Sequence, residues 1–222
     1  RWGLHDGNTS DTHDPGTYLT RQMIFLAHTH RSFLTMINPD NSLGPDLATG
    51  WSASPDATVW TFELNPNATF HSGRKVTAAD VVASMNHHRG ETTTSAAKAL
   101  LNVVTDIRAE DDHTVVFELE TGTADWPYIL TDYHLIILPA NDDGTANWQA
   151  EICSGPYKFV SHEPGVRSEL VRHEEWHRID EGAWFDAVTM ITLNDANSRQ
   201  TALVTGQVVV VLVIFQLGMH ST

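Results

Sequence analysis

The chain has 222 residues, 41% of them hydrophobic, and a formal net charge of −15 that arises from 28 Asp and Glu against 13 Lys and Arg. So acidic a chain is not expected to bind nucleic acid by neutralising phosphates, nor to adhere to an anionic membrane surface. The longest apolar run, Val208–Phe215, is far shorter than the roughly 18 residues that a membrane-spanning helix needs.

The first half of the chain predicts helices and one strand. Met23, Leu26, Ala27, His30 and Leu34 recur at helical spacing and predict a helix over Gln22–Leu34. Val59–Leu64 has the composition of a strand. Thr77 and Asp80 stand at the spacing of a capping box, so a helix should start there and run to about Asn86. A further helix is expected over Ser95–Leu101.

The second half predicts mostly strands. Thr105–Ala109 and Thr114–Leu119 have the pattern of a β-hairpin. Gly206 should end a helix over Ala196–Thr205. The remaining expected strands are Leu135–Leu138, Tyr157–Ser161, Glu169–Arg172, Ala187–Leu193 and Gln207–Phe215. This irregular alternation predicts a mixed α/β or α+β chain in two lobes.

The segment His173-Glu174-Glu175-Trp176-His177 fits the pattern H-E-x-x-H. In zinc proteases this pattern places two histidines one helical turn apart, with the Glu as general base. Here a predicted strand precedes the motif and no amphipathic helix surrounds it. A polar loop is therefore the preferred interpretation, and a zinc metalloenzyme remains the alternative.

Two further pairs of histidines and the single cysteine are weaker candidates for metal binding or catalysis. His28 and His30 would diverge on a helix, and His87 and His88 are adjacent at a predicted helix end. We interpret all four as surface residues. Cys153 could act as a nucleophile only beside a base, and a buried thiol is the preferred interpretation. We therefore expect no catalytic residue, no metal site and no cofactor.

Four ordered segments carry a resemblance to a known family: Leu47–Trp51, Asp56–Leu64, Phe70–Gly73 and Val76–Ser84. Their pattern of tryptophans, the Trp-Thr-Phe triplet, a Phe-His-x-Gly turn and Thr-Ala-x-Asp-Val resembles the signature region of the extracytoplasmic solute-binding proteins of family 5. These are the peptide- and nickel-binding components of ABC importers. The Gly-Pro-Tyr strand within Ser154–Phe159 agrees with the same resemblance.

The resemblance implies a periplasmic-binding-protein type II-like lobe with an inserted small α+β domain. The first ligand-binding lobe would comprise residues 1–34 and 139–222, and the insert residues 35–138. Members of the family are usually about twice as long, so the second ligand lobe is expected to be absent from this chain.

The implied function is not enzymatic. We expect the chain to bind a di- or oligopeptide in a hinge cleft and to deliver it to the membrane subunits of an ABC permease, as a monomer. The expected location is the periplasm or another extracytoplasmic space, with the signal peptide outside these residues. The expected ligand-binding residues are Tyr18, Leu19, Thr20, Arg21, Met23, Tyr133 and His134. Tyr18 and Met23 also resemble the nickel-binding branch, so nickel or a metal chelate is the alternative ligand.

Overall fold

The computed structural model describes residues 1–150 and 152–211 of the chain. Helices and strands alternate irregularly along the chain, as the sequence predicts for a mixed α/β or α+β fold. Within the described residues, no helix combines the length and the apolar character required to cross a membrane. The elements in chain order are β1 (Trp2–Leu4), η1 (Pro15–Thr17), α1 (Arg21–His30), β2 (Thr35–Ile37), β3 (Leu43–Pro45), β4 (Ala48–Ala53), β5 (Val59–Leu64), α2 (Ala78–His87), η2 (Lys98–Leu101), β6 (Val104–Ala109), β7 (Thr114–Leu119), α3 (Trp126–Ile129), β8 (Tyr157–Glu163), β9 (Arg167–Arg172), β10 (Ala187–Thr192), α4 (Ala196–Val204) and β11 (Val210–Val211).

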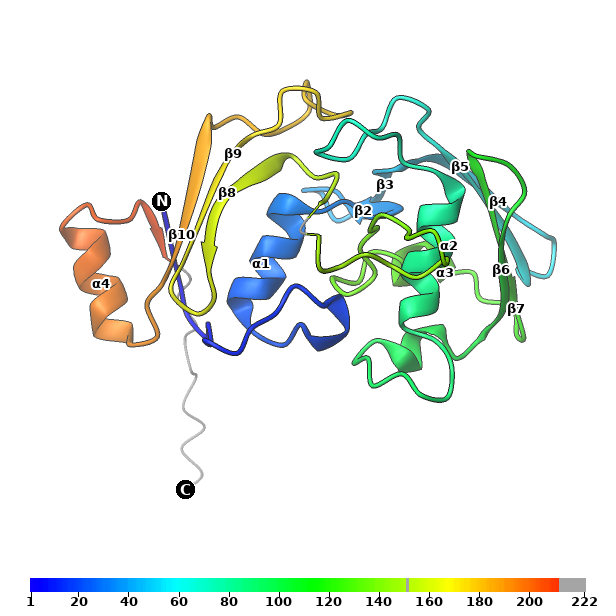
Figure 1. Cartoon of the computed structure of the whole chain (residues 1–222), viewed down its shortest axis with the longest axis horizontal. Helices are drawn as coiled ribbons and strands as arrows, with labels where there is room; N and C mark the ends of the chain where they lie inside the picture. Colours follow the sequence, from blue (N-terminus) through cyan, green and yellow to red (C-terminus); the bar gives the residue numbers. More distant parts are fainter. Residues whose placement is uncertain (151, 212–222) are drawn as a thin grey trace.

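One five-stranded sheet has the strand order β11-β1-β10-β9-β8. β1 pairs in parallel with both β10 and β11, whereas β8, β9 and β10 are antiparallel. Figure 1 shows this sheet between α1 and α4. Met23 and Leu26 of α1 pack against Leu170 and Met190 of the sheet, and these residues belong to one buried core. We call this half of the molecule the sheet lobe.

A four-stranded antiparallel sheet, β4-β5-β7-β6, forms the other half with α2 packed against β6 and β7 (Figure 1). Buried and less buried side chains alternate along β5, as a strand with one covered face requires, whereas the central part of β7 is buried throughout. Phe62 and Phe117 meet edge to face at a ring separation of 5.5 Å, and Trp126 lies 5.4 Å from Phe117. These rings lie at the centre of a second core. We call this half, residues 35–138, the insert.

Two segments are shared between the cores. Phe33 belongs to the core of the sheet lobe, and the next residue, Leu34, belongs to that of the insert. Residues 135–138 alternate in the same way, with Leu135 and Ile137 on the insert side and Ile136 and Leu138 on the sheet-lobe side. The chain therefore passes between the halves in segments that are buried on both sides. We call the contact between the halves the seam.

Several predicted elements are confirmed with close bounds, among them β5, β7 and the paired strands β8 and β9. The capping box at the start of α2 is also confirmed, with Thr77 and Asp80 in the expected roles. The predicted helix over residues 95–101 is reduced to the short 3-10 turn η2. Of the strand predicted over Gln207–Phe215, the structure shows β11, and residues 212–215 lie outside the described residues.

Two predictions were wrong for the same physical reason. The helix predicted to reach Leu34 ends at His30, because Arg31 is extended and the His30 carbonyl accepts from the Gly155 amide. Residues 135–138 are apolar and buried but do not join a sheet. The Ile137 amide donates to the Ser32 carbonyl instead. In both places tertiary hydrogen bonds replace the local pattern that the sequence suggests.

Candidate ligand-binding face

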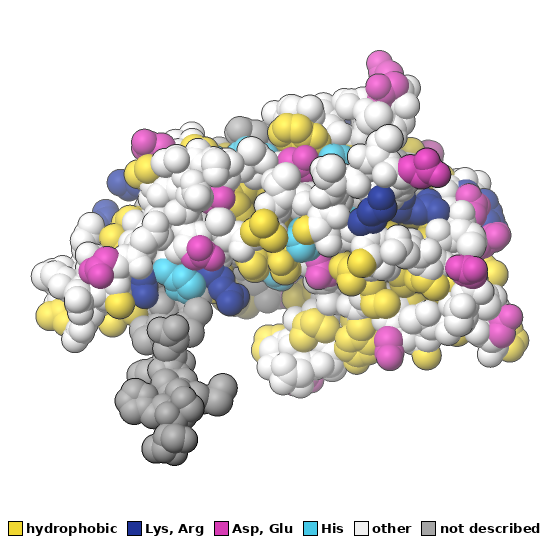
Figure 2. Space-filling model, turned by 90° about the horizontal axis from the view of Figure 1, so that it is seen from below, with side chains coloured by type: hydrophobic (Ala, Val, Ile, Leu, Met, Phe, Trp, Pro, Cys, Tyr) yellow, Lys and Arg dark blue, Asp and Glu magenta, His cyan; other side chains and the backbone are white. Residues whose placement is uncertain are grey.

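A cavity of about 640 Å³ lies where β1 and β10 end. Ligands of open α/β sheets bind outside the carboxyl ends of the strands, so this is the first place to examine. Figure 2 looks onto this face, where histidine and basic side chains gather near the described end of the chain. The lining residues are His5, Asp6, Gly7, Asn8, Thr20, Asn194, Ala196 and Arg199.

The cavity wall is built by a loop that Asn194 fixes. The Asp6 and Gly7 amides donate to Asn194 Oδ1 at 2.8 and 3.3 Å, and Asn194 Nδ2 donates to the Gly7 carbonyl at 3.2 Å. Asp6 has a φ of 66°, a left-handed conformation that Asp tolerates better than most residues. A Cβ at Gly7 would meet the Gln22 side chain, so this position suits glycine.

The start of α1 forms the neighbouring wall. Thr20 is the N-cap, and its Oγ1 accepts from the Met23 amide at 3.4 Å and donates to Asp11 Oδ2 at 2.8 Å. Of the residues predicted from the sequence, Thr20 lines the cavity, Arg21 is exposed, and Leu19 is 72% exposed. These three are accessible to a ligand.

The loop that carries Tyr133 and His134 is tied to the same segment. His134 Nε2 lies 2.9 Å from the Tyr18 carbonyl oxygen, and His134 Nδ1 lies 2.7 Å from Asp132 Oδ1. Tyr133 stacks obliquely on His134 at a ring separation of 4.1 Å. Burial and Asp132 raise the Tyr133 pKa, and Arg21 opposes the rise. Arg21 and Tyr133 are therefore electrostatic neighbours.

The side chains of Tyr18 and Met23 lie in the core and are each 1% exposed. Tyr18 Oη donates to the His13 carbonyl at 3.1 Å, and burial raises the Tyr18 pKa to about 12. His134 is also buried, at 6% exposure. These three residues support the accessible residues from beneath and present little surface to a ligand.

The face carries charges of both signs. Burial, Arg199 and Arg21 lower the His5 pKa, and Asp6 opposes the shift. Arg199 donates through Nη1 to the carbonyl oxygens of Leu193 and Asn194 at 2.6 and 3.0 Å. Sequence reasoning missed His5, Asn194 and Arg199 as residues of this face. No local pattern joins the ends of β1 and β10, which meet only through their parallel pairing.

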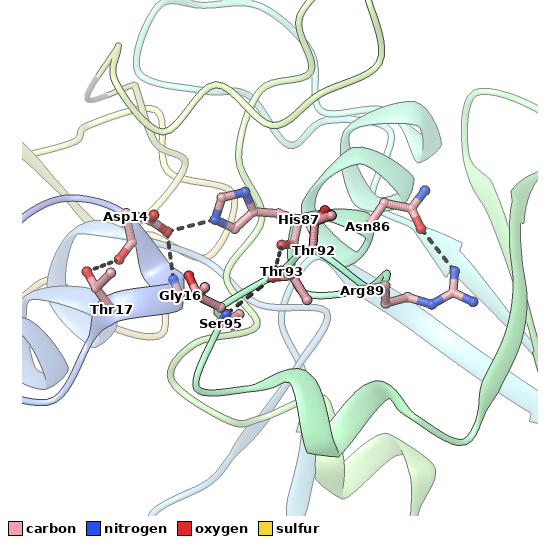
Figure 3. Close-up of a pocket in the computed structure, with 10 residues that line it drawn as sticks. Asp14, Gly16, Thr17, Asn86, His87, Arg89, Thr92, Thr93 and Ser95 are labelled. Atoms are coloured by element: carbon pink, nitrogen blue, oxygen red, sulfur yellow. Dashed lines mark hydrogen bonds and ion pairs between the residues drawn. The ribbon is translucent and has the colours of Figure 1, made fainter.

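A second cavity, of about 360 Å³, lies between η1 and the end of α2 (Figure 3). His87 Nε2 is 2.7 Å from Asp14 Oδ1, which also accepts from the Gly16 amide at 2.8 Å. Burial opposes a low pKa for Asp14, but these hydrogen bonds outweigh it and lower that pKa. Arg89 bonds Asn86 and turns away from the Asp14–His87 pair, as Figure 3 shows.

The two histidines of the H-E-x-x-H segment have different partners. His173 is 1% exposed, and its Nδ1 lies 3.3 Å from the Gly155 carbonyl oxygen. His177 Nε2 lies 3.1 Å from Asp46 Oδ1 across the seam. The segment forms turns rather than a helix, as the loop interpretation predicts. Its geometry is thus not that of the zinc-protease motif.

The four histidines interpreted as surface residues divide into two kinds. His28 is exposed and His87 is partly buried. The surface interpretation was wrong for His30 and His88, which are fully buried. His30 packs against β8 and His88 bonds Ser95 at 2.6 Å, so tertiary packing rather than helix position decides their burial. Cys153 is buried, as predicted.

Comparison with known proteins places most of the chain in one family. Residues 42–217 match the family model described as bacterial extracellular solute-binding proteins, family 5 Middle. Over 138 residues the chain is 34% identical to the probable peptide ABC transporter periplasmic-binding protein y4tO of Sinorhizobium fredii, covering 60% of this chain and 25% of that protein. It is 32% identical over 173 residues to the probable D,D-dipeptide-binding periplasmic protein DdpA of Escherichia coli, covering 73% and 32%. The HTH-type transcriptional regulator SgrR of Salmonella typhi is 31% identical over 153 residues, covering 68% and 26%.

Solved structures agree on the fold. The chain superposes on the binding protein AgaA from A. tumefaciens R10, in complex with agropinic acid, with a TM-score of 0.81 and 28% identity, covering 93% of this chain and 42% of that one. Haemophilus influenzae OppA in complex with the peptide RPPGFSPFR gives a TM-score of 0.81 at 19% identity, covering 93% and 44%. The chain thus spans less than half of these structures, and a quarter to a third of the curated relatives described above.

Proposed function

Because the chain belongs to the bacterial extracellular solute-binding proteins of family 5, we propose that it forms one wall of a cleft that binds a peptide-like solute for an ABC importer. Relatives named as peptide- and dipeptide-binding periplasmic proteins support this ligand class. The proposed location is extracytoplasmic, the proposed partner is the ABC permease, and the proposed state is a monomer. The proposed role is binding and delivery without catalysis.

The observation that carries the proposal is the cavity at the carboxyl ends of β1 and β10. Thr20 lines the cavity, Leu19 and Arg21 are its exposed neighbours in the chain, and Tyr133 is an electrostatic neighbour of Arg21. We propose these four residues as ligand contacts. Basic and acidic side chains both border the cavity. This mixture suits a zwitterionic peptide, whose two ends carry opposite charges.

The proposed architecture is a lobe of residues 1–34 and 139–222 with residues 35–138 as the insert. The two hydrophobic cores support this division. A second lobe would supply the opposite wall, since the solved structures are more than twice as long as this chain. Closure around the solute would then shift an open–closed equilibrium toward the closed form.

The test is a titration of the 222-residue chain with trialanine, followed by backbone amide NMR. With one wall present we expect weak binding, and shifts confined to residues 5–8, 19–21, 133 and 194–199. Arg21→Ala should reduce these shifts, whereas Arg167→Ala, an exposed arginine paired with Glu169 on the sheet, should not. Shifts elsewhere, or none at millimolar peptide, would contradict the proposed site. Sub-micromolar affinity by calorimetry would contradict the one-wall architecture.

The two alternatives predict different results. The nickel or metal-chelate alternative rested on the 13 histidines of the chain and on Tyr18 and Met23, whose side chains are buried. A zinc enzyme would need His173 and His177 to share a metal, but their rings bond Gly155 and Asp46. We expect no stoichiometric zinc by elemental analysis of the purified chain. Stoichiometric zinc that is lost in His173→Ala would favour the enzyme instead.

A further inference from the structure

A column of six buried or partly buried rings crosses the seam between the sheet lobe and the insert. Successive ring centroids are separated by 4.6, 5.2, 3.8, 4.9 and 4.9 Å. Five of the six rings are histidines, and one of them, His71, comes from the insert. The column runs in the order His162, His13, Phe159, His30, His71 and His173.

The hydrogen bonds of the ring column suit neutral imidazoles. His30 Nδ1 lies 2.8 Å from the Tyr157 carbonyl oxygen, and His71 Nε2 lies 3.0 Å from that of Gly155. Each ring thus has one acceptor for its single N–H. Among the described residues, no acceptor meets the buried Nε2 of His30 or His162. A second proton there would place a charged N–H where nothing receives it.

The column also lies against fixed positive charge. Arg31 is 2% exposed, and its Nη2 is 3.3 Å from His13 Nδ1. Lys158 acts on His71 and His173 from β8. Two acids act in the opposite sense, Asp11 on His162 and Glu175 on His173. His177 adds to the positive side when it is protonated.

Burial is the largest cause of a lowered pKa at all five histidines of the column. It brings the pKa of His13 to about 3, with Arg31 and His162 adding to the effect. It brings the pKa of His71 to about 4 against the bond to Gly155, which opposes the shift. The pKa values of His30, His162 and His173 are also lowered.

We propose that the ring column is an acid-sensitive latch, which holds the sheet lobe against the insert while its imidazoles are neutral and releases the seam in mild acid. Backbone bonds cross the seam at the same place. The His71 amide donates to the Cys153 carbonyl at 2.6 Å, and Cys153 leads directly into the segment that bonds His30. Charging the rings therefore loosens a contact that joins the two halves.

The direction of the pH effect follows from linkage. Above about pH 6.5 the rings are neutral in the closed and the open states, so they contribute no pH dependence. As the pH falls, the opened state binds protons and the closed state does not. Each such ring then lowers the closed-to-open ratio about tenfold per pH unit. The loss continues until the pH reaches the pKa of the closed state.

Three histidine–carboxylate pairs lie near the seam: His87–Asp14, His134–Asp132 and His177–Asp46. Hydrogen bonds to histidine lower the pKa of Asp14 and Asp132 against the opposing effect of burial. The carboxylates of Asp14 and Asp132 therefore stay ionised in the mildly acidic range in which the latch opens.

The test compares amide hydrogen exchange of the 222-residue chain at pH 7.5 and pH 5.5, with rates corrected for intrinsic exchange. The reporters are the amides of His71 and Gly155 at the seam and those of β7 within the insert. We expect the seam amides to lose protection at least a hundredfold while β7 stays protected. Equal loss in both places, or unchanged protection at the seam, would overturn the latch.

A variant isolates the contribution of one ring. His71→Gln can still donate to the Gly155 carbonyl but does not titrate, so the acid-induced loss at the seam should be about tenfold smaller at pH 5.5. The control, His113→Gln, changes an exposed histidine and should match the wild type. If His71→Gln does not fold, NMR of the wild-type imidazoles decides. Ordinary titration of the column histidines near pH 6.5 in the closed protein would refute the proposal.

Discussion

Replacing Asp80 with alanine is expected to destabilise the chain severely, because this one carboxylate joins α2 to two other segments. Asp80 is fully buried. Its Oδ2 accepts from the Thr77 amide at 2.8 Å, which closes the capping box of α2. Its Oδ1 accepts from the Ala140 amide at 2.7 Å and from Arg74 Nη2 at 2.6 Å.

The expected loss of stability follows from the hydrogen-bond donors that Asp80→Ala leaves without an acceptor. Two backbone N–H groups, of Thr77 and Ala140, lose a charged acceptor in part-buried surroundings. An unsatisfied buried donor costs about 1–3 kcal/mol. Arg74 is 46% exposed and is rehydrated, so its own loss is small. The free energy of unfolding should therefore fall by about 3–5 kcal/mol.

Urea unfolding followed by tryptophan fluorescence measures this loss. With a denaturant slope of about 2–3 kcal/mol/M, the midpoint of Asp80→Ala should fall by about 1–2 M. Asp106→Ala is the matched control, since that carboxylate is 54% exposed in a surface ion pair, and its midpoint should stay near that of the wild type. If Asp80→Ala and Asp106→Ala unfold at the same urea concentration, the reasoning about buried acceptors fails.

Two further substitutions test the seam. Gly155→Ala would bring a Cβ against the backbone of Arg31, including its carbonyl oxygen at 2.6 Å, so we expect thermal unfolding to show a loss of about 3 kcal/mol or more. Gly50→Ala meets nothing within 4 Å and should be tolerated; similar melting of the two variants would contradict the packing at Gly155. Ser84→Ala removes the hydroxyl that accepts from the Leu138 amide at 2.8 Å. It should cost about 1–2 kcal/mol in urea unfolding, and Ser84→Thr, which keeps a hydroxyl, should recover part of that loss.

The candidate face was predictable only in part. Thr20 and Arg21 were named from the family resemblance, and the structure places them at the cavity or beside it. Met23 was named by the same reasoning, but its helical spacing already favoured the core, where it lies. Asn194 has no signal in the sequence, since its role depends on bonds to residues 6 and 7 at the other end of the chain.

The sequence by itself determined those helices and strands that are specified by residues within a few positions of one another. The capping box fixed the start of α2, and strand-favouring composition and the hairpin pattern fixed β5 and β7. The ordered tryptophan and glycine pattern from Leu47 to Ser84 was enough to identify the family. Each of these features depends on residues that are near neighbours in the chain, so the sequence alone carries it.

Tertiary structure decided what depends on distant partners. β1 is three residues long and becomes a strand only because it pairs with β10 and β11. His30 and His71 entered the seam because β8 and the Gly155 segment pack against them. Burial and proton affinity are properties of that surrounding packing. The sequence could show that the chain is rich in histidine, but only the fold could select the five that form the ring column.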